Sequence, residues 1–93
     1  DNDIKKMASR VFQVSALTPL DEFNESFGTG FDEEDADTIG GIVLHAFGHM
    51  PERGESIQLG DLTFKVSKAN SRRLLQLQVI KAKQSVVTED NGS

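Results

Sequence analysis

Apolar and polar residues alternate along four stretches of the chain, which is the pattern of half-buried strands. These stretches are residues 12–16, 57–59, 62–66 and 75–79. Gly60 and Asp61 separate the second stretch from the third and predict a two-residue hairpin turn. In the last stretch, Leu75, Leu77 and Val79 are the residues expected to face the core.

Two other stretches have the three-to-four-residue spacing of an amphipathic helix. In the first, Leu20, Phe23 and Phe27 line one face. Thr18 is the expected N-cap, and Pro19 would occupy the first helical position, where its missing N–H group has no cost. A short helix is therefore predicted directly after the first strand.

The second helical stretch begins after an acidic run, and Asp35 or Asp37 is its expected N-cap. The predicted buried face consists of Ile39, Ile42, Val43, Ala46 and Phe47. Gly40 and Gly41 lie inside this helix, although each interior glycine costs about 1 kcal/mol relative to alanine. They indicate that the helix backbone lies close to another segment.

Five residues in this region are predicted to have structural roles: Gly40, Gly41, Gly48, Pro51 and Gly54. Gly48 is expected to end the helix, and Pro51 follows at a distance typical of a helix stop. The sequence contains no internal repeat.

The order strand, helix, helix, strand, strand, strand predicts an α+β fold with two layers. We expect an antiparallel-rich sheet with both helices on one face. Residues 10–83 would form the domain. Residues 1–9 are expected to be an N-terminal linker and residues 84–93 a C-terminal tail, because both are polar and lack an apolar period.

Composition narrows the functional classes. The 93 residues suffice for one core, and the absence of cysteine excludes disulfides and thiolate metal sites. A net charge of −5 disfavours nucleic acid as a partner. No apolar run reaches the length of about 18 residues needed to span a bilayer, so no direct membrane span is expected.

The acidic run supplies oxygen ligands of the kind that Mg²⁺ and Ca²⁺ prefer. The candidate metal ligands are Asp32, Glu33, Asp35 and Asp37. The run lacks the spacing of an EF-hand loop, and carboxylates before a helix also interact favourably with its dipole. We favour the solvated, helix-capping interpretation, with a metal-binding segment as the alternative.

His45 and His49 are four residues apart, but neither a third ligand nor a catalytic glutamate accompanies them. The glycines do not match a phosphate-binding loop, and no nucleophile elbow is present. We therefore expect no catalytic residues, no enzymatic activity and no cofactor in this domain.

The stretches "FQVSALTPLDEFNESFG", "DTIGGIVLHAFGHMPERGE" and "SRRLLQLQV" together resemble the CorC/HlyC transporter-associated domain. The resemblance covers about residues 10–83, and its most specific part runs from Asp37 to Gly41. The fold is also similar to that of FAD-binding domains.

The resemblance implies a regulatory or interaction domain of a protein linked to magnesium and cobalt efflux or resistance. Such domains usually follow a pair of CBS domains, where ATP or AMP binds, and some relatives add a membrane transport component. A cytoplasmic location, at the inner face of the bacterial inner membrane, is implied. A homodimer formed through a strand edge is a further expectation. The alternative function is binding of FAD, an adenine nucleotide or Mg²⁺.

Overall fold

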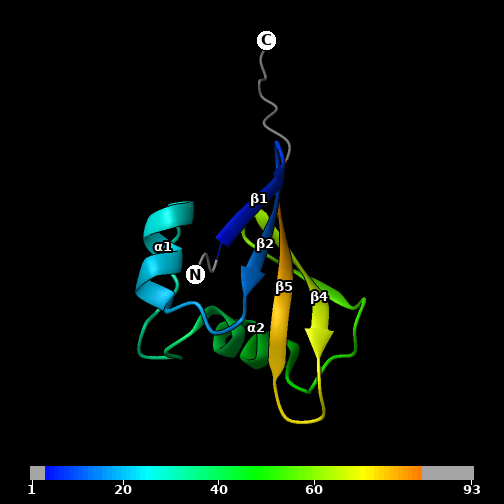
Figure 1. Ribbon diagram of the computed structural model, residues 1–93. Coiled ribbons are helices and arrows are strands. Elements are labelled where there is room, and N and C mark those ends of the chain that lie inside the picture. The colour runs from blue at the N-terminus through cyan, green and yellow to red at the C-terminus, as the bar shows by residue number, and fades with distance from the viewer. Residues whose placement is uncertain (1–3, 83–93) are drawn as a thin grey trace.

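The structure, a computed structural model, describes residues 4–82 and contains five strands and two helices (Figure 1). The elements are β1 (Ile4–Ala8), β2 (Val11–Ser15), α1 (Leu20–Phe27), α2 (Ile39–Phe47), β3 (Ser56–Leu59), β4 (Leu62–Ala69) and β5 (Leu74–Lys81). The predicted α+β class, with two successive helices between strands, is confirmed.

The five strands form one sheet in the order β1-β2-β5-β4-β3, and every neighbouring pair is antiparallel. Strands β4 and β5 pair along most of their length and form the centre of the sheet. The predicted two-residue turn joins β3 to β4, with Gly60 at φ 63°, in the left-handed region that a hairpin turn of this length requires.

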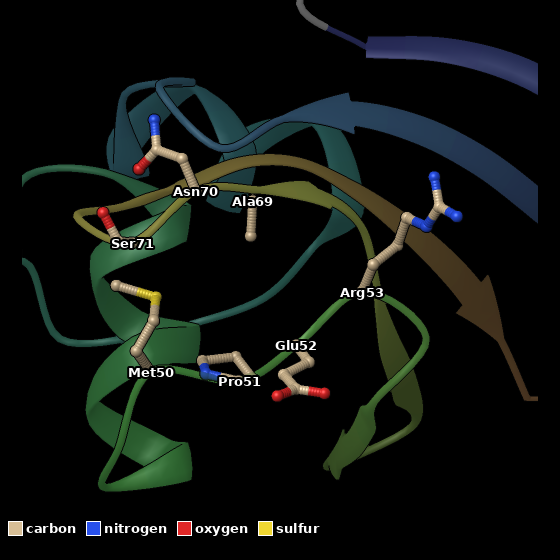
Figure 2. Close-up of a pocket in the computed structure, with 7 residues that line it drawn as sticks. All are labelled: Met50, Pro51, Glu52, Arg53, Ala69, Asn70 and Ser71. Atoms are coloured by element: carbon tan, nitrogen blue, oxygen red, sulfur yellow. The ribbon is translucent and has the colours of Figure 1, made fainter.

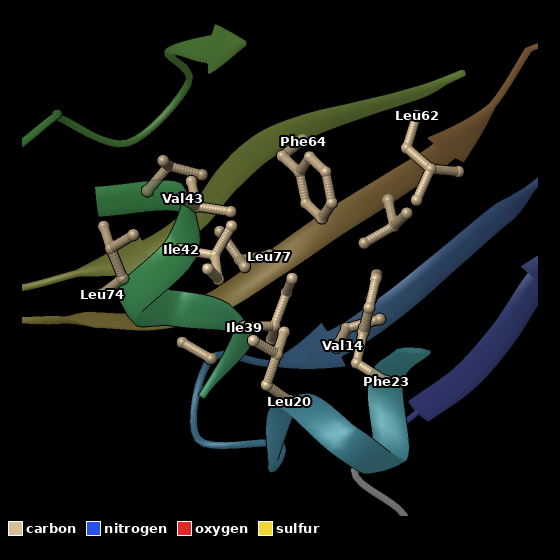
Figure 3. Close-up of a cluster of buried hydrophobic side chains, with 13 residues drawn as sticks. Val14, Leu20, Phe23, Ile39, Ile42, Val43, Leu62, Phe64, Leu74 and Leu77 are labelled. Atoms are coloured by element: carbon tan, nitrogen blue, oxygen red, sulfur yellow. The ribbon is translucent and has the colours of Figure 1, made fainter. Parts of the chain in front are cut away.

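Both helices cover the same face of the sheet and share one hydrophobic core with it (Figure 3). The buried core residues are Val14, Ala16, Leu20, Phe23, Ile39, Ile42, Val43, Leu62, Phe64, Val66, Leu74, Leu77 and Val79. Phe23 of α1 is fully buried, stacks on Phe27 at 4.3 Å between ring centroids and lies 5.8 Å from Phe64 of β4. The predicted two-layer arrangement is therefore confirmed.

Strand β1 corrects the prediction that residues 1–9 are a linker. Residues 4–8 pair with β2, with Lys5 opposite Gln13 and Lys6 opposite Phe12. The strand was not predicted because it lies at the sheet edge and its residues are mostly exposed, so its sequence has no alternation. Lysines and the irregular register after Lys6 are features that protect an edge strand from pairing with another chain.

The predicted N-caps of both helices are wrong. Helix α1 begins one residue later than expected, at Leu20, and Thr18 is fully buried, with its hydroxyl donating to the carbonyl oxygen of Ser15 at 2.7 Å. Thr38, not Asp35 or Asp37, is the N-cap of α2. The Thr18 hydroxyl bonds to Ser15 instead of capping α1, and the Thr38 hydroxyl accepts the Gly41 N–H, which is the role expected of an aspartate.

The face assignments fail at two positions. Leu74 is buried and Leu75 is 39% exposed, the reverse of the predicted alternation. The cause is the irregular pairing with β4: Lys68 is opposite Gln76 but Ala69 is opposite Leu74, so Leu75 is an extra, unpaired residue of β5. In α2, Ala46 is exposed, whereas Leu44 and Phe47 of the same turn pack against the core.

The C-terminal tail predicted for residues 84–93 lies outside the described residues. The last described strand ends at Lys81, whose backbone N–H donates to the carbonyl oxygen of Arg10 at 2.8 Å.

Replacing Phe23 with alanine should destabilise the domain by about 3–5 kcal/mol, because a fully buried aromatic side chain at the centre of the core is removed. Chemical denaturation of the purified domain measures this loss. The exposed neighbour Glu22 provides the control, and Glu22→Ala should change the unfolding free energy by less than about 0.5 kcal/mol. Equal effects of the two substitutions would contradict the placement of α1.

Candidate functional site

The glycine-containing start of α2 lies directly against the chain that connects β2 to α1. The two segments run antiparallel: Gly40 N–H donates to Ala16 O at 2.9 Å, Ile39 N–H to Thr18 O at 3.0 Å, and Leu20 N–H to Asp37 O at 2.9 Å. On its other side this connecting segment is bonded to β5, since Ala16 N–H donates to the carbonyl oxygen of Leu75 at 3.0 Å. The helix start is thus an extension of the sheet's hydrogen bonding.

These contacts satisfy three of the four N–H groups that the first turn of a helix normally leaves without an intrahelical partner. Ile39 and Gly40 donate to the connecting segment, as above. Gly41 N–H donates to the Thr38 hydroxyl oxygen at 3.2 Å, and Ile42 N–H then makes the first regular intrahelical bond, to the Thr38 carbonyl oxygen at 3.2 Å. A phosphate or flavin pyrophosphate at this helix start would have to displace main-chain bonds.

Gly40 is required here because its backbone touches backbone. A Cβ atom at position 40 would lie 2.7 Å from both the Cβ and the carbonyl oxygen of Ala16. At position 41 a Cβ atom would lie 2.8 Å from the Cβ of Ala36, a side chain of the preceding loop. The two glycines therefore let α2 approach two different neighbours.

The remaining residues predicted to be structural lie in and after the helix end. Gly48 caps α2 in the left-handed conformation, with φ 78° and its N–H bonded to Leu44 O. Pro51 is buried. Gly54 has φ 96° and donates its N–H to the carbonyl oxygen of Val66 at 2.8 Å, which fastens this loop to β4.

The acidic candidates form an exposed turn and are not a preformed metal site. Asp32, Glu33, Asp35 and Asp37 are all exposed. The Asp32 carboxylate accepts the N–H of Glu34 at 2.9 Å, so part of its capacity goes to stabilising the turn. Among residues 4–82, no cluster of three or more histidine, cysteine, aspartate or glutamate side chains has metal-binding geometry.

The two histidines lie at the end of α2. His45 is exposed in the last turn, whereas His49 lies beyond the Gly48 cap with its ring 5.8 Å from that of Phe47. The helix has ended between them, so the four-residue spacing does not place both imidazoles on one helical face.

A shallow depression of about 380 Å³ lies between the loop after α2 and the turn joining β4 to β5 (Figure 2). It is lined by Met50, Pro51, Glu52, Arg53, Ala69, Asn70 and Ser71. Its volume is at the lower end for ligand sites, and of its lining residues Pro51 is buried while the charged and amide side chains are exposed. The depression has few of the features that hold a cofactor away from water.

The sequence analysis missed two features of the fold. The Asn24 side chain of α1 accepts hydrogen bonds from Thr29 Oγ1 and the Phe31 N–H, and it donates to the Phe31 carbonyl oxygen. It thereby fixes the loop that follows α1. Leu17 and Leu75 are both exposed on adjoining segments, at 57% and 39%.

Comparison with known proteins identifies the family. The family model described as the transporter associated domain, CorC_HlyC, matches residues 5–83. The chain belongs to this family.

The curated relatives are substantially longer than the domain. The magnesium and cobalt efflux protein CorC of Vibrio cholerae is 48% identical over 77 residues, which cover 83% of this chain and 26% of that protein. The protein of the same name from Escherichia coli strain K12 is 47% identical over 79 residues, or 85% of this chain and 27% of that protein. The chain thus spans about a quarter of the length of these relatives.

Solved structures of the family have the same fold. The CorC-associated region of a Mg²⁺ and Co²⁺ transporter from Neisseria meningitidis MC58 superposes with a TM-score of 0.84 at 38% identity, and the match covers 87% of this chain and 100% of that one. Within residues 4–82, no helix is long and apolar enough to cross a membrane.

Replacing Gly40 with alanine should destabilise the domain, because the new methyl group meets the Ala16 carbonyl oxygen. Overpacking costs about 1–3 kcal/mol, and the better helix propensity of alanine returns about 1 kcal/mol. Chemical denaturation should show a smaller loss for Gly41→Ala, because its short contact is with the Ala36 side chain and not with main-chain atoms, and no loss for Gly30→Ala, where nothing lies within 4 Å. A Gly40→Ala domain as stable as the wild type would show that this contact is not close.

Replacing Thr38 with alanine should lower the unfolding free energy by about 1 kcal/mol through loss of the N-cap. Thr38→Ser keeps the hydroxyl group and should retain most of the stability. Thermal or urea denaturation of the two variants distinguishes the cap from a packing effect of the threonine methyl group, which both variants lose.

Proposed function

We propose that this chain is a non-catalytic regulatory and interaction domain of a protein that functions in magnesium and cobalt efflux. It modulates ion transport through surface contacts with the other parts of that protein. These include a CBS domain pair that binds adenine nucleotides and a membrane transport component. The domain acts in the cytoplasm, at the inner face of the bacterial inner membrane.

The engaged N–H groups at the start of α2 are the observation that supports this proposal. They belong to the most specific part of the family pattern, Asp37 to Gly41, and they bond to the main chain of the same domain. A segment whose N–H groups are bonded within the domain makes the shape of the domain rigid. The names of the V. cholerae and E. coli relatives supply the link to magnesium and cobalt efflux.

The proposal can be tested in the full-length E. coli relative, which this chain matches over 27% of its length. Deleting the matched region should slow Co²⁺ efflux from metal-loaded cells while the protein still accumulates. A chimera that carries residues 4–82 of this chain in its place should restore efflux. Unchanged efflux after the deletion, at equal protein levels, would contradict a regulatory role.

Calorimetric titration of the isolated domain separates this function from its alternative, the binding of FAD, an adenine nucleotide or Mg²⁺. We expect no saturable heat with FAD, ATP, Mg²⁺ or Co²⁺. Saturable binding of any one of them, lost on substitution of Asp32 and Asp35 or of Gly40, would favour a ligand-binding domain instead.

A further inference from the structure

One row of polar side chains crosses the whole sheet. Its members come from all five strands, and each is paired with the next: Lys5, Gln13, Gln78, Lys65 and Ser56. The two lysines are exposed, and the two glutamines between them are half-buried. The pairing therefore places two ammonium groups and two amides on one face of the sheet.

The adjacent row shows which way this face points. Phe12, Val79 and Phe64 are paired across β2, β5 and β4, and they pack in the core between the sheet and the helices (Figure 3). Because successive side chains of a strand point to opposite faces, the row that contains Lys5 points away from the helices. Lys6, opposite Phe12, points to the helix side.

A second polar row extends the same face. Ser15 pairs with Gln76, and Gln76 pairs with the exposed Lys68. The described strands contain no aspartate or glutamate. This face is therefore positively charged, although the chain as a whole has a net charge of −5. We call it the lysine face, which consists of Lys5, Lys65, Lys68, Gln13, Gln76 and Gln78.

We propose that the lysine face docks against a carboxylate-bearing surface elsewhere in the same full-length protein. This proposal rests on the proposed function, for which it names the contact surface and the chemistry of the partner. The ammonium groups pair with carboxylates, and the glutamine amides, which both donate and accept, bond to polar groups between them. The chain spans about a quarter of the length of its curated relatives, and the remainder of such a protein supplies the partner surface.

A membrane or a nucleic acid fits this face less well. Basic clusters that bind anionic lipids have about 4–8 lysines or arginines, each worth about 1 kcal/mol. The two polar rows contain three lysines. Nucleic-acid surfaces add arginines and aromatic rings on which bases stack, and neither residue type occurs in these rows. An acidic protein surface is the partner that a flat, lightly charged and amide-rich face favours.

The dimensions of the sheet set the expected strength of docking. Five strands spaced about 4.8 Å apart give a face about 20 Å wide, which corresponds to the small end of specific interfaces. A small and polar contact forms reversibly, and it should weaken as salt screens its ion pairs.

Lysine labelling tests the docking in a full-length protein. The E. coli chimera that carries residues 4–82 of this chain is acetylated with an amine-reactive reagent, and mass spectrometry compares each lysine with the same lysine in the isolated chain. Lys5, Lys65 and Lys68 should react about tenfold more slowly in the chimera, as expected for a surface that is covered about nine-tenths of the time. Lys6 is the matched control, because it lies on the same strand as Lys5 but points to the helix side, and it should react equally in both proteins.

Carbodiimide cross-linking tests the chemistry of the partner, because this reagent joins an amine only to a carboxylate in direct contact. In the chimera, cross-links should join Lys65 or Lys68 to aspartates or glutamates outside the substituted region. High salt should reduce their yield.

Charge reversal shows whether the lysines hold the contact or are merely covered by it. Lys5→Glu with Lys68→Glu should return Lys65 to the labelling rate of the isolated chain. Lys6→Glu with Lys81→Glu changes the net charge equally on the helix side, where the Lys81 ammonium lies 5.9 Å from the centre of the Phe12 ring, and should leave Lys65 protected. Circular dichroism melts establish that both variants are folded.

Protection of the three lysines, with cross-links to carboxylates, supports the proposal. Equal labelling in the chimera and the isolated chain overturns it, as does protection that persists after Lys5→Glu with Lys68→Glu. Protection of the isolated chain by phosphatidylglycerol vesicles alone also overturns it, because the face would then bind a membrane. A chimera that restores Co²⁺ efflux with its lysines unprotected refutes only the docking surface, whereas unchanged efflux after the deletion refutes the proposed function whatever the labelling shows.

Discussion

The structure depends on one main-chain contact, where the Gly40 N–H donates to the Ala16 carbonyl oxygen. The residues around Ala16 are bonded to β5 on one side and to the start of α2 on the other. Both helices begin within four residues of this point on their own chain segments, at Leu20 and Ile39. The contact therefore fixes where each helix begins. The hydrophobic core lies between the two helices and the sheet (Figure 3).

The energetics explain why a helix tolerates glycine in this place. A glycine in the first turn costs about 1 kcal/mol in helix propensity. A buried N–H group without a partner costs about 1–3 kcal/mol, and the side chain of any other residue would hold the helix away from Ala16. The cost of Gly40 is thus smaller than the cost of losing the bonds it allows. For function, the consequence is that this helix start is occupied by its own chain.

The sequence predicted the elements whose patterns are local. Strand β4 and the Gly60 turn follow from alternation and turn chemistry, and the end of α2 at Gly48 follows from its left-handed cap. Strand β1 could not be predicted in this way, because its stability comes from pairing with β2 and its own residues are mostly exposed. Leu74 is buried in place of Leu75 because Leu75 is skipped in the pairing of β5 with β4, which the alternation of apolar residues does not reveal.

In the candidate site, too, local patterns predicted some features, while others depend on the fold. The paired glycines indicated close approach, yet only the fold shows that Gly40 meets Ala16 and Gly41 meets Ala36. The charges also follow the layers: in the described residues, the strands carry lysines and no carboxylates, which lie in helices, turns and loops.

Amide hydrogen exchange of Gly40, followed by NMR, tests the central contact most directly. Amides in the first turn of a helix normally exchange quickly, because they lack intrahelical partners. Bonded to Ala16, the Gly40 amide should exchange only on global unfolding, as slowly as the central amides of β4 and β5. Exchange at the rate of an exposed loop amide such as that of Gly30 would contradict the account.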